Sequence, residues 1–226
     1  WLVEVEGDIS NNKYSELTVN VKGNTSITGL MHKEAKSVIN VNLEDGGKWS
    51  FSKNYKNGST TTTINSLNIG NDGILDVTFY PSETDDETGI YTMKLTSDGI
   101  NNDGTLTNAG EINLYNGSYK DVFTIEGNYH GNNGNIIMNT LWNAPGGENG
   151  ENSESDLVYI TGNASGSTRV SPSSFEDEAD YNVIDGTIQQ LSTRLNSVPV
   201  VKVAGNSTPT TFTGTAKTAG AAEAQL

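Results

Sequence analysis

The chain has no cysteine, five prolines, and only 13 basic residues against 28 acidic ones among its 226. Without cysteine it has neither a disulfide framework nor a thiolate zinc site. No stretch approaches the roughly 18 consecutive apolar residues of a membrane helix. A net charge of −15 with no basic stripe predicts that nucleic acid is not a partner.

Three residue types dominate what is present, with 28 asparagines, 26 threonines and 25 glycines. All three are poor helix formers, which excludes a helical bundle or a coiled coil. Hydrophobic residues make up only 33% of the chain, and they come in short β-branched clusters, so the chain needs a fold with a thin, regularly repeated core. The chain begins at Trp1 without an initiator Met or a signal segment, and we expect it to be a piece of a longer protein.

Short segments of alternating apolar and polar residues recur along the chain, as in strands with one buried face. They are separated by Gly, Asn and Asp, which favour turns. The predicted strands are Leu17–Val21, Ile39–Leu43, Trp49–Phe51, Leu67–Ile69, Leu75–Phe79, Tyr91–Leu95 and Ile112–Leu114.

Four of these segments share a motif of glycine, any residue, apolar, any residue, apolar. It begins at Gly47, Gly73, Gly110 and Gly134, at intervals of 26, 37 and 24 residues. An irregular recurrence of this length indicates a solenoid of stacked coils. The middle interval is long enough for an additional short coil and a loop.

We therefore predict an all-β fold, a right-handed single-stranded parallel β-helix with a C-terminal cap. Its turns take positive φ at Gly and Asn, and stacked Asn and Thr side chains form hydrogen-bonded ladders. An antiparallel β-sandwich also has many short strands, but a repeated glycine-led motif is not one of its features.

Three segments depart from the alternating pattern. Residues 145–156 form a polar, acidic loop. Residues 171–196 form an insert whose acidic run is followed by apolar residues spaced three to four apart, which predicts a short amphipathic helix on the solenoid. Thr60–Thr63 is expected at a solvated strand or loop edge.

From about Val122 the order of motifs becomes specific. Gly127-Asn-Tyr129 and Gly131-Asn-Asn-Gly134 are followed by Ser155-Asp156-Leu157-Val-Tyr159-Ile160-Thr-Gly162-Asn-Ala164-Ser165-Gly166-Ser-Thr168, and then by Val200-Val201-Lys-Val203-Ala-Gly205-Asn-Ser207. This succession resembles the C-terminal end of the passenger domain of pertactin-like and AIDA-like autotransporters, the type V secretion proteins of Gram-negative bacteria. It covers roughly 100 residues. The closing aromatic pattern of that family is replaced here by Ala222 and Ala224.

The resemblance implies a β-helix secreted through the outer membrane to the cell surface or beyond, with a cognate outer-membrane barrel in the full-length protein. Residues 1–121 are then coils of the passenger, and residues 122–226 form a cap or autochaperone-like region continuous with them. The resemblance further implies a structural cap in which some residues pack in the core and glycines set the turns. The core positions are Leu157, Tyr159, Ile160 and Val170, and the turn positions are Gly162, Gly166 and Gly205.

The residues give little support for catalysis, a metal or a cofactor, and we expect none of the three. Ser165 lacks the nucleophile-elbow motif and an assigned base, and His32 and His130 lie in unrelated contexts. Asn71–Gly73 and Asp98–Gly104 contain calcium-like residues but match neither the EF-hand nor the calcium β-roll spacing. They are read as turns.

The leading hypothesis is a non-catalytic, surface-exposed stalk and folding cap of an adhesin or virulence factor. Its partner would be a host cell-surface protein or glycan, or a second copy of the protein. Candidate ligand-binding loops are Pro81–Thr88, Pro145–Asp156 and Phe175–Asp180. The alternative is a carbohydrate-active β-helix enzyme that uses paired loop carboxylates, for which the candidates are Glu83, Asp85, Asp86 and Glu87.

Overall fold

All regular elements of the described structure are β-strands, as the composition predicts. The computed structural model describes residues 4–6, 9–11, 15–34, 36–54, 58–78, 89–96, 104–141, 154–173, 199–217 and 223–225. No helix in these ranges is long or apolar enough to cross a membrane.

The strands stack in three faces that repeat in chain order. The first face contains β1 (Glu4–Glu6), β4 (Ser26–Thr28), β7 (Lys48–Ser50), β10 (Ile74–Asp76) and β13 (Glu111–Asn113). The second contains β2 (Ile9–Asn11), β5 (Met31–Lys33), β8 (Thr61–Ile64), β11 (Ile90–Leu95), β14 (Val122–Glu126), β17 (Leu157–Ile160) and β19 (Val201–Val203). The third contains β3 (Glu16–Val21), β6 (Val38–Leu43), β9 (Ser66–Ile69) and β12 (Thr105–Asn108).

Two long strands, β15 (Asn128–Leu141) and β18 (Ala164–Ser173), continue from the third face into the first. β20 (Phe212–Lys217) pairs with residues 168–170 in the middle of β18. Two short strands pair antiparallel to this stack, β16 (Glu154–Ser155) with β15 and β21 (Glu223–Gln225) with β20.

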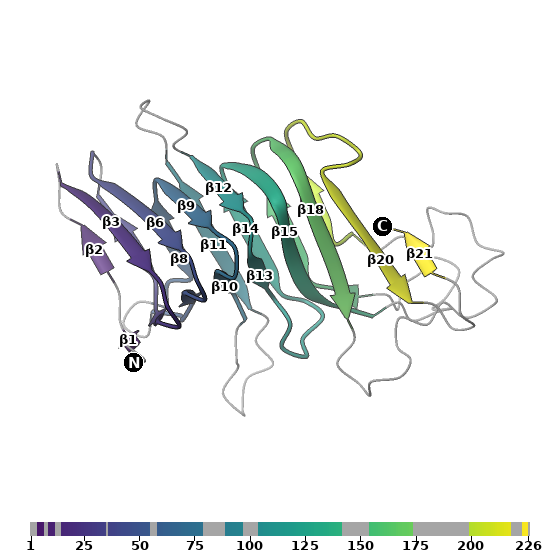
Figure 1. The fold of residues 1–226 in the computed structure, drawn as a ribbon, viewed down its shortest axis with the longest axis horizontal. Coiled ribbons are helices and arrows are strands. Elements are labelled where there is room, and N and C mark those ends of the chain that lie inside the picture. The colour runs from purple at the N-terminus through teal and green to yellow at the C-terminus, as the bar shows by residue number, and fades with distance from the viewer. Residues whose placement is uncertain are drawn as a thin grey trace.

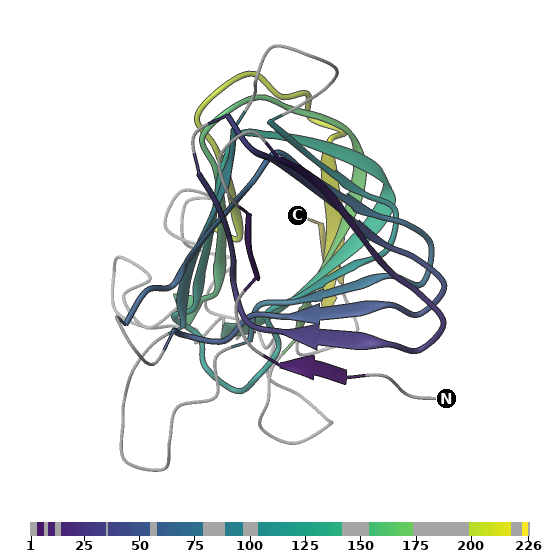
Figure 2. The same cartoon turned by 90° about the vertical axis from the view of Figure 1, so that its left-hand side faces the viewer.

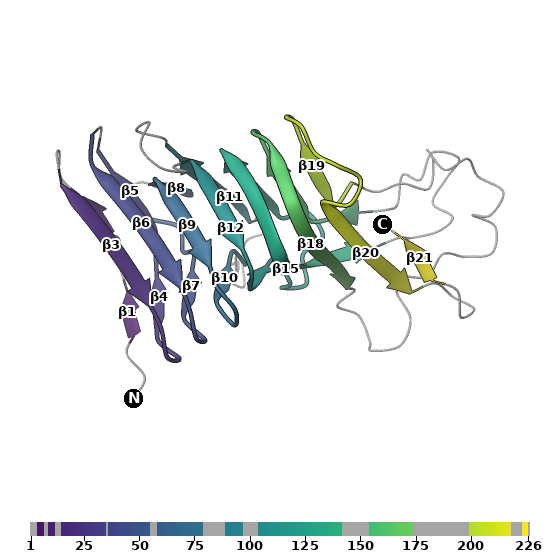
Figure 3. The same ribbon diagram turned by 45° about the horizontal axis from the view of Figure 1, so that its top comes forward.

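The described strands of the three faces pair in parallel, each with its counterpart in the next coil. Figures 1 and 3 show the strands side by side from the N-terminal to the C-terminal end, and Figure 2 shows the coils superposed around one central column. The fold is the predicted parallel β-helix.

The glycine-led repeat occupies one column of the first face. Trp49, Leu75, Ile112 and Ile136, the first apolar residues of the four motifs, are successive register partners. The 37-residue interval is a single coil made of β10, β11 and β12 and contains no additional coil. It is longer than its neighbours because residues 79–88 and 97–103, which lie outside the described residues, fall between its strands.

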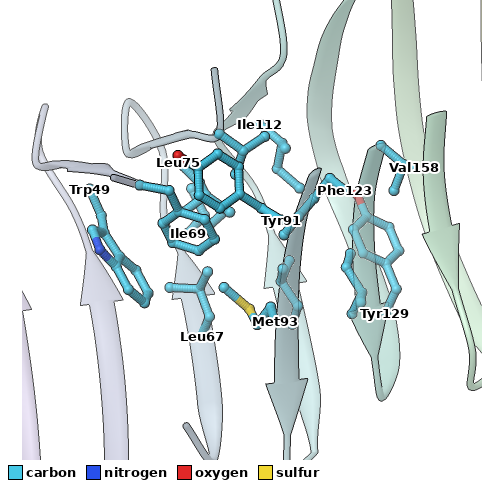
Figure 4. Close-up of a cluster of buried hydrophobic side chains, with 14 of the residues drawn as sticks. Trp49, Leu67, Ile69, Leu75, Tyr91, Met93, Ile112, Phe123, Tyr129 and Val158 are labelled. Carbon is cyan, nitrogen blue, oxygen red and sulfur yellow. The ribbon is translucent and has the colours of Figure 1, made fainter. Parts of the chain in front are cut away.

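The core is a narrow stack of in-register side chains along the axis. Tyr91, Phe123 and Val158 form one column of the second face, and all three are buried. Phe51 joins this column to Trp49, with ring centroids 5.4 Å from Tyr91 and 4.8 Å from Trp49. Figure 4 shows Trp49, Tyr91 and Phe123 among the core side chains. Because each coil adds only a few apolar residues, a low overall hydrophobic content suffices.

Threonine and asparagine link the coils, but not always at the surface. Asn42 donates to Asn20 at 2.8 Å on the exposed side of the third face, which is the predicted kind of ladder. The expectation for Thr60–Thr63 is wrong at Thr62, which is fully buried. Its hydroxyl donates to the Met31 carbonyl at 2.8 Å and accepts from the Met31 amide at 2.9 Å. The Thr62 side chain thus takes the place of a backbone hydrogen-bond partner for Met31 in the neighbouring coil.

Of the insert at residues 171–196, the structure describes only the first three residues, which belong to β18. The helix predicted in its later part lies outside the described residues. The proposed division at residue 121 falls within a continuous stack, because β11, β14 and β17 pair in register across it. The separate roles of the two parts stay a prediction.

Candidate functional site

A ladder of Gly-Asn pairs distinguishes the C-terminal coils. The pairs beginning at Gly127, Gly162 and Gly205 occupy successive coils at the corner between the second and third faces. Asn128 Oδ1 accepts from the Asn163 amide, and Asn163 Oδ1 accepts from the Asn206 amide, both at 2.9 Å. Each asparagine side chain therefore binds the backbone of the coil that follows it.

The glycines of this corner are required by close approach. The Gly162 amide donates to the Gly127 carbonyl at 2.9 Å, and the Gly205 amide donates to the Gly162 carbonyl at 3.1 Å. A Cβ on Gly205 would lie 2.5 Å from the Gly162 carbonyl oxygen, and one on Gly162 would overlap the Gly127 carbonyl oxygen. The coils can stack at this spacing only without side chains.

Gly166, the third predicted turn glycine, lies within β18 rather than at the Gly-Asn corner. Its φ of +78° is one that side-chain-bearing residues rarely adopt, and a Cβ there would overlap the Gly131 carbonyl oxygen of the preceding coil. Both observations require glycine at this bend.

A buried tyrosine in β15 links three successive coils. Tyr129 is fully buried, and its hydroxyl accepts from Asn108 Nδ2 at 3.1 Å and pairs with Thr168 Oγ1 at 2.8 Å. Burial raises the pKa of Tyr129 to about 12, against the opposing effect of these hydrogen bonds. The ring lies 5.4 Å from that of Phe212, a half-buried residue of β20 that covers the apolar column from the C-terminal side.

A second polar cluster lies at the opposite corner, between the first and second faces. Asp156 is fully buried and accepts two backbone amides, that of Asn139 at 2.7 Å and that of Asp121 at 3.0 Å. Asp121, also buried, accepts from the Gly89 amide at 2.7 Å and from Asn116 Nδ2 at 2.6 Å. Two carboxyl groups thus tie three successive coils together.

The described structure places no cation against either carboxyl group. Burial raises the pKa of Asp156 to about 8, although the amides of Asn139 and Asp121 oppose the shift, and it raises the pKa of Asp121 as well. Asn139 Nδ2, beside this pair, is buried without a hydrogen-bond partner in the described part of the chain. The stability of this corner is therefore expected to depend on pH.

The structure corrects the predicted core positions of β17. Ile160 is fully buried and Val170 nearly so, as expected. Leu157 and Tyr159 are instead half-buried on the outer side, and Val158 between them enters the core. The error is one of phase: all four residues of β17 are apolar or aromatic, and pairing with β14 decides which of them face inward.

Ser165 and His130 do meet, which the sequence did not reveal. They are register partners on the third face, with His130 Nδ1 3.0 Å from Ser165 Oγ. The pair is exposed, and among the described residues no carboxylate hydrogen-bonds to the other imidazole nitrogen. The geometry is that of a cross-coil polar pair, while His32 lies far from it, exposed on β5.

The three predicted ligand loops connect the same two faces of the solenoid. They connect β10 to β11, β15 to β17, and β18 to β19, so each joins the first face to the second. Most of their residues, with the candidate carboxylates Glu83, Asp85, Asp86 and Glu87, lie outside the described residues, as do residues 98–103 of the calcium-like run. Within the described ranges no group of His, Asp or Glu side chains is arranged to hold a metal.

Sequence reasoning missed the Tyr129 cluster and the Asp121–Asp156 pair. One signal was available: an aspartate directly precedes β14 and again precedes β17, 35 residues later. The partners of Tyr129, by contrast, come from strands up to 39 residues away and appear only in the folded stack.

Comparison with known proteins concerns mainly this C-terminal half. The family model described as Autochaperone Domain Type 1 matches residues 99–226. The uncharacterized protein YuaQ of Escherichia coli (strain K12) is 31% identical over 109 residues, which cover 48% of this chain and 7% of YuaQ. No solved structure matches the chain.

Proposed function

This chain belongs to the type 1 autochaperone domain family, and we propose that its C-terminal coils act as the folding cap of an autotransporter passenger. The matched residues contain the Gly-Asn ladder, the Tyr129 cluster and the Asp121–Asp156 pair. Membership implies a route through the outer membrane of a Gram-negative bacterium to the cell surface or medium.

The observation that carries the proposal is the set of cross-coil side-chain contacts made by the C-terminal coils. Each coil of a solenoid binds only its neighbours, so folding starts where one local set of contacts is strong and then propagates. The C-terminal coils have cross-coil contacts that do not depend on regular repetition, above all those of Tyr129 with Asn108 and Thr168. Once formed, they present the edges of β12 and β13 to the preceding coils.

The test is the effect of matched core truncations on refolding rate. Ile160 in β17 and Ile69 in β9 are both fully buried, and Ile→Val at either is expected to lower stability by about 1 kcal/mol. If the C-terminal coils form first, Ile160→Val slows refolding and Ile69→Val mainly speeds unfolding. Stopped-flow refolding and unfolding of residues 1–226 measure both rates.

The expected ratio of the activation to the equilibrium free-energy change is roughly 0.5 or more at Ile160 and near zero at Ile69. The reverse order would place the folding nucleus in the N-terminal coils and refute the cap. Equal ratios at Ile160 and Ile69 would mean that folding does not start at the C-terminal coils, which would also contradict the cap.

We also propose a non-catalytic, adhesive role for the passenger. Its ligand would be a host cell-surface protein or glycan, or another copy of the passenger, and its anchor the cognate outer-membrane barrel of the full-length protein. Three of the connections join the first face to the second, which supports this proposal because binding residues are often carried by the segments that connect rigid strands. Binding of the chain to cultured host cells, with and without competing glycans, tests it; no binding and no self-association would contradict it.

A further inference from the structure

The outer side of the second face differs from the rest of the surface. Ile90 of β11 is 53% exposed, the one large hydrophobic residue of the described structure that is this open to solvent. In register beside it lie Val122 and Leu157, which point outward from β14 and β17 and are half-buried. The three side chains form an outward aliphatic column across three coils, which we name the Ile90 column.

The next two columns of this face are flat and nearly neutral. Thr61, Thr92, Thr124 and Tyr159 form the second column. The third contains the Lys94–Glu126 pair, whose charged atoms are 3.5 Å apart. Lys202 lies over the Tyr159 ring at 5.4 Å. On β8, β11, β14, β17 and β19 the outward charged side chains are thus two lysines and one glutamate, on a chain of net charge −15.

We propose that this face docks a second copy of the chain, related by a two-fold axis that runs parallel to the strands between β11 and β14. Such an axis places Lys94 opposite Glu126 of the second copy, and the reciprocal pair forms at the same time. It also places Ile90 opposite Val122 of the second copy and Thr92 opposite Thr124. Sheets packed face to face lie about 10 Å apart, which these side chains span.

Charge and shape both favour a copy of the same chain as the occupant. Two molecules that each carry 15 net negative charges repel one another, and a face without net negative charge reduces this repulsion at contact. A two-fold interface requires a patch that is complementary to itself. The adjacent Lys94 and Glu126 satisfy this requirement, since reversing the order of the coils exchanges them.

This inference deepens the self-association part of the proposed function, and its failure leaves the refolding test of the cap unaffected. The experiment is sedimentation velocity of residues 1–226 from micromolar to sub-millimolar concentration, at low and high salt. We expect a reversible dimer. Ile90→Asp should raise its dissociation constant by at least about tenfold, as expected for a central interface residue.

The matched control is Ile74→Asp, which alters a half-buried aliphatic side chain on the outer side of the first face and should leave the dimer unchanged. A charge-swap series then tests the orientation. Lys94→Glu should weaken the dimer at low salt, and Lys94→Glu combined with Glu126→Lys should restore it, because the swap keeps both reciprocal pairs.

Three results would overturn the proposal: a monomer at every concentration, equal effects of Ile90→Asp and Ile74→Asp, or a swap variant that associates no better than Lys94→Glu alone. A fourth measurement addresses another occupant. The chain has no cysteine, so Ile90→Cys provides a unique thiol. Slow labelling of that thiol in a monomeric sample would show that another part of the chain covers the Ile90 column, and would also refute the dimer.

Discussion

The two halves of the solenoid are held together in different ways. In the N-terminal half, register partners of the first face are 22 or 26 residues apart, and the coils are linked by repeating contacts such as the Asn20–Asn42 pair. Farther along, the steps from β15 to β18 and from β18 to β20 are 34 and 44 residues. There the links are the Gly-Asn ladder at the corner and two sets of buried polar contacts, those of Tyr129 and of two aspartates.

The difference shows that the regular coils of this solenoid and its C-terminal coils are held together by different kinds of contact. Regular coils need only a repeated pattern of apolar and polar residues, and similar contacts stabilise each of them. The C-terminal coils accommodate long insertions and still keep the same corner spacing, because glycine permits close backbone approach at each of them. The predictions that follow test this contrast, from the largest expected effect to the smallest.

Glycine at the C-terminal corner should tolerate substitution far less than glycine in an N-terminal turn. Gly162→Ala places a Cβ against the Gly127 carbonyl, and we expect a loss of about 3 kcal/mol of stability. Gly23→Ala has open space and suffers mainly from its φ of +64°, which costs roughly 1 kcal/mol. Urea unfolding followed by circular dichroism measures both, and equal losses would remove the contrast.

Loss of the Tyr129 hydroxyl should remove a hydrogen-bond partner from two buried groups at once. Tyr129→Phe leaves Asn108 Nδ2 and Thr168 Oγ1 without this partner, so we expect a loss of about 2 kcal/mol. The control is Tyr159→Phe, at a half-buried position on the outer side of β17. Hydrogen exchange of the C-terminal coils should increase in Tyr129→Phe alone; unchanged exchange would show that the cluster does not hold the coils together.

Stability of the C-terminal coils should fall as pH rises. The folded-state pKa of Asp156 is about 8, above the unfolded value of 3.8, so between these values the folded chain binds more protons than the unfolded chain. Stability is therefore greatest below pH 3.8 for this group and is lost up to pH 8, at no more than about 1.4 kcal/mol per pH unit.

Asp156→Asn removes this titration, and its stability should be flatter across the same range. Thermal unfolding from pH 4 to 8 compares the two proteins. If the wild type and Asp156→Asn show the same pH dependence, Asp156 is not the group responsible.

The smallest effects should come from the asparagine ladders. Asn163→Ala removes the acceptor for a backbone amide of the next coil and should cost about 1 kcal/mol. Asn42→Ala removes an exposed side-chain pair and should cost no more than about 0.5 kcal/mol. Chemical denaturation of the two variants side by side decides the order, and a larger loss for Asn42→Ala would reverse the comparison.

Much of the repeat was readable from the chain. The alternating segments became β3, β6, β7, β9, β10, β11 and β13, because a strand with one buried face requires period-two alternation. The resemblance predicts turns at Gly162, Gly166 and Gly205; the structure places the first and last at the Gly-Asn corner and Gly166 within β18. The cap role of these glycines and of Ile160 and Val170 stays a prediction, which the refolding and substitution experiments address.

The sequence by itself determined that this protein is an acidic, all-β solenoid, because its composition disfavours helices and its glycine-led motif recurs. Only the tertiary structure decided which residues of neighbouring coils come into contact. Leu157 and Tyr159 face outward because β14 fixes the register of an all-apolar segment. Asp121 and Asp156 are buried because neighbouring coils enclose them and supply backbone amides. Such choices depend on contacts between residues 17 to 35 positions apart, and no local pattern encodes them.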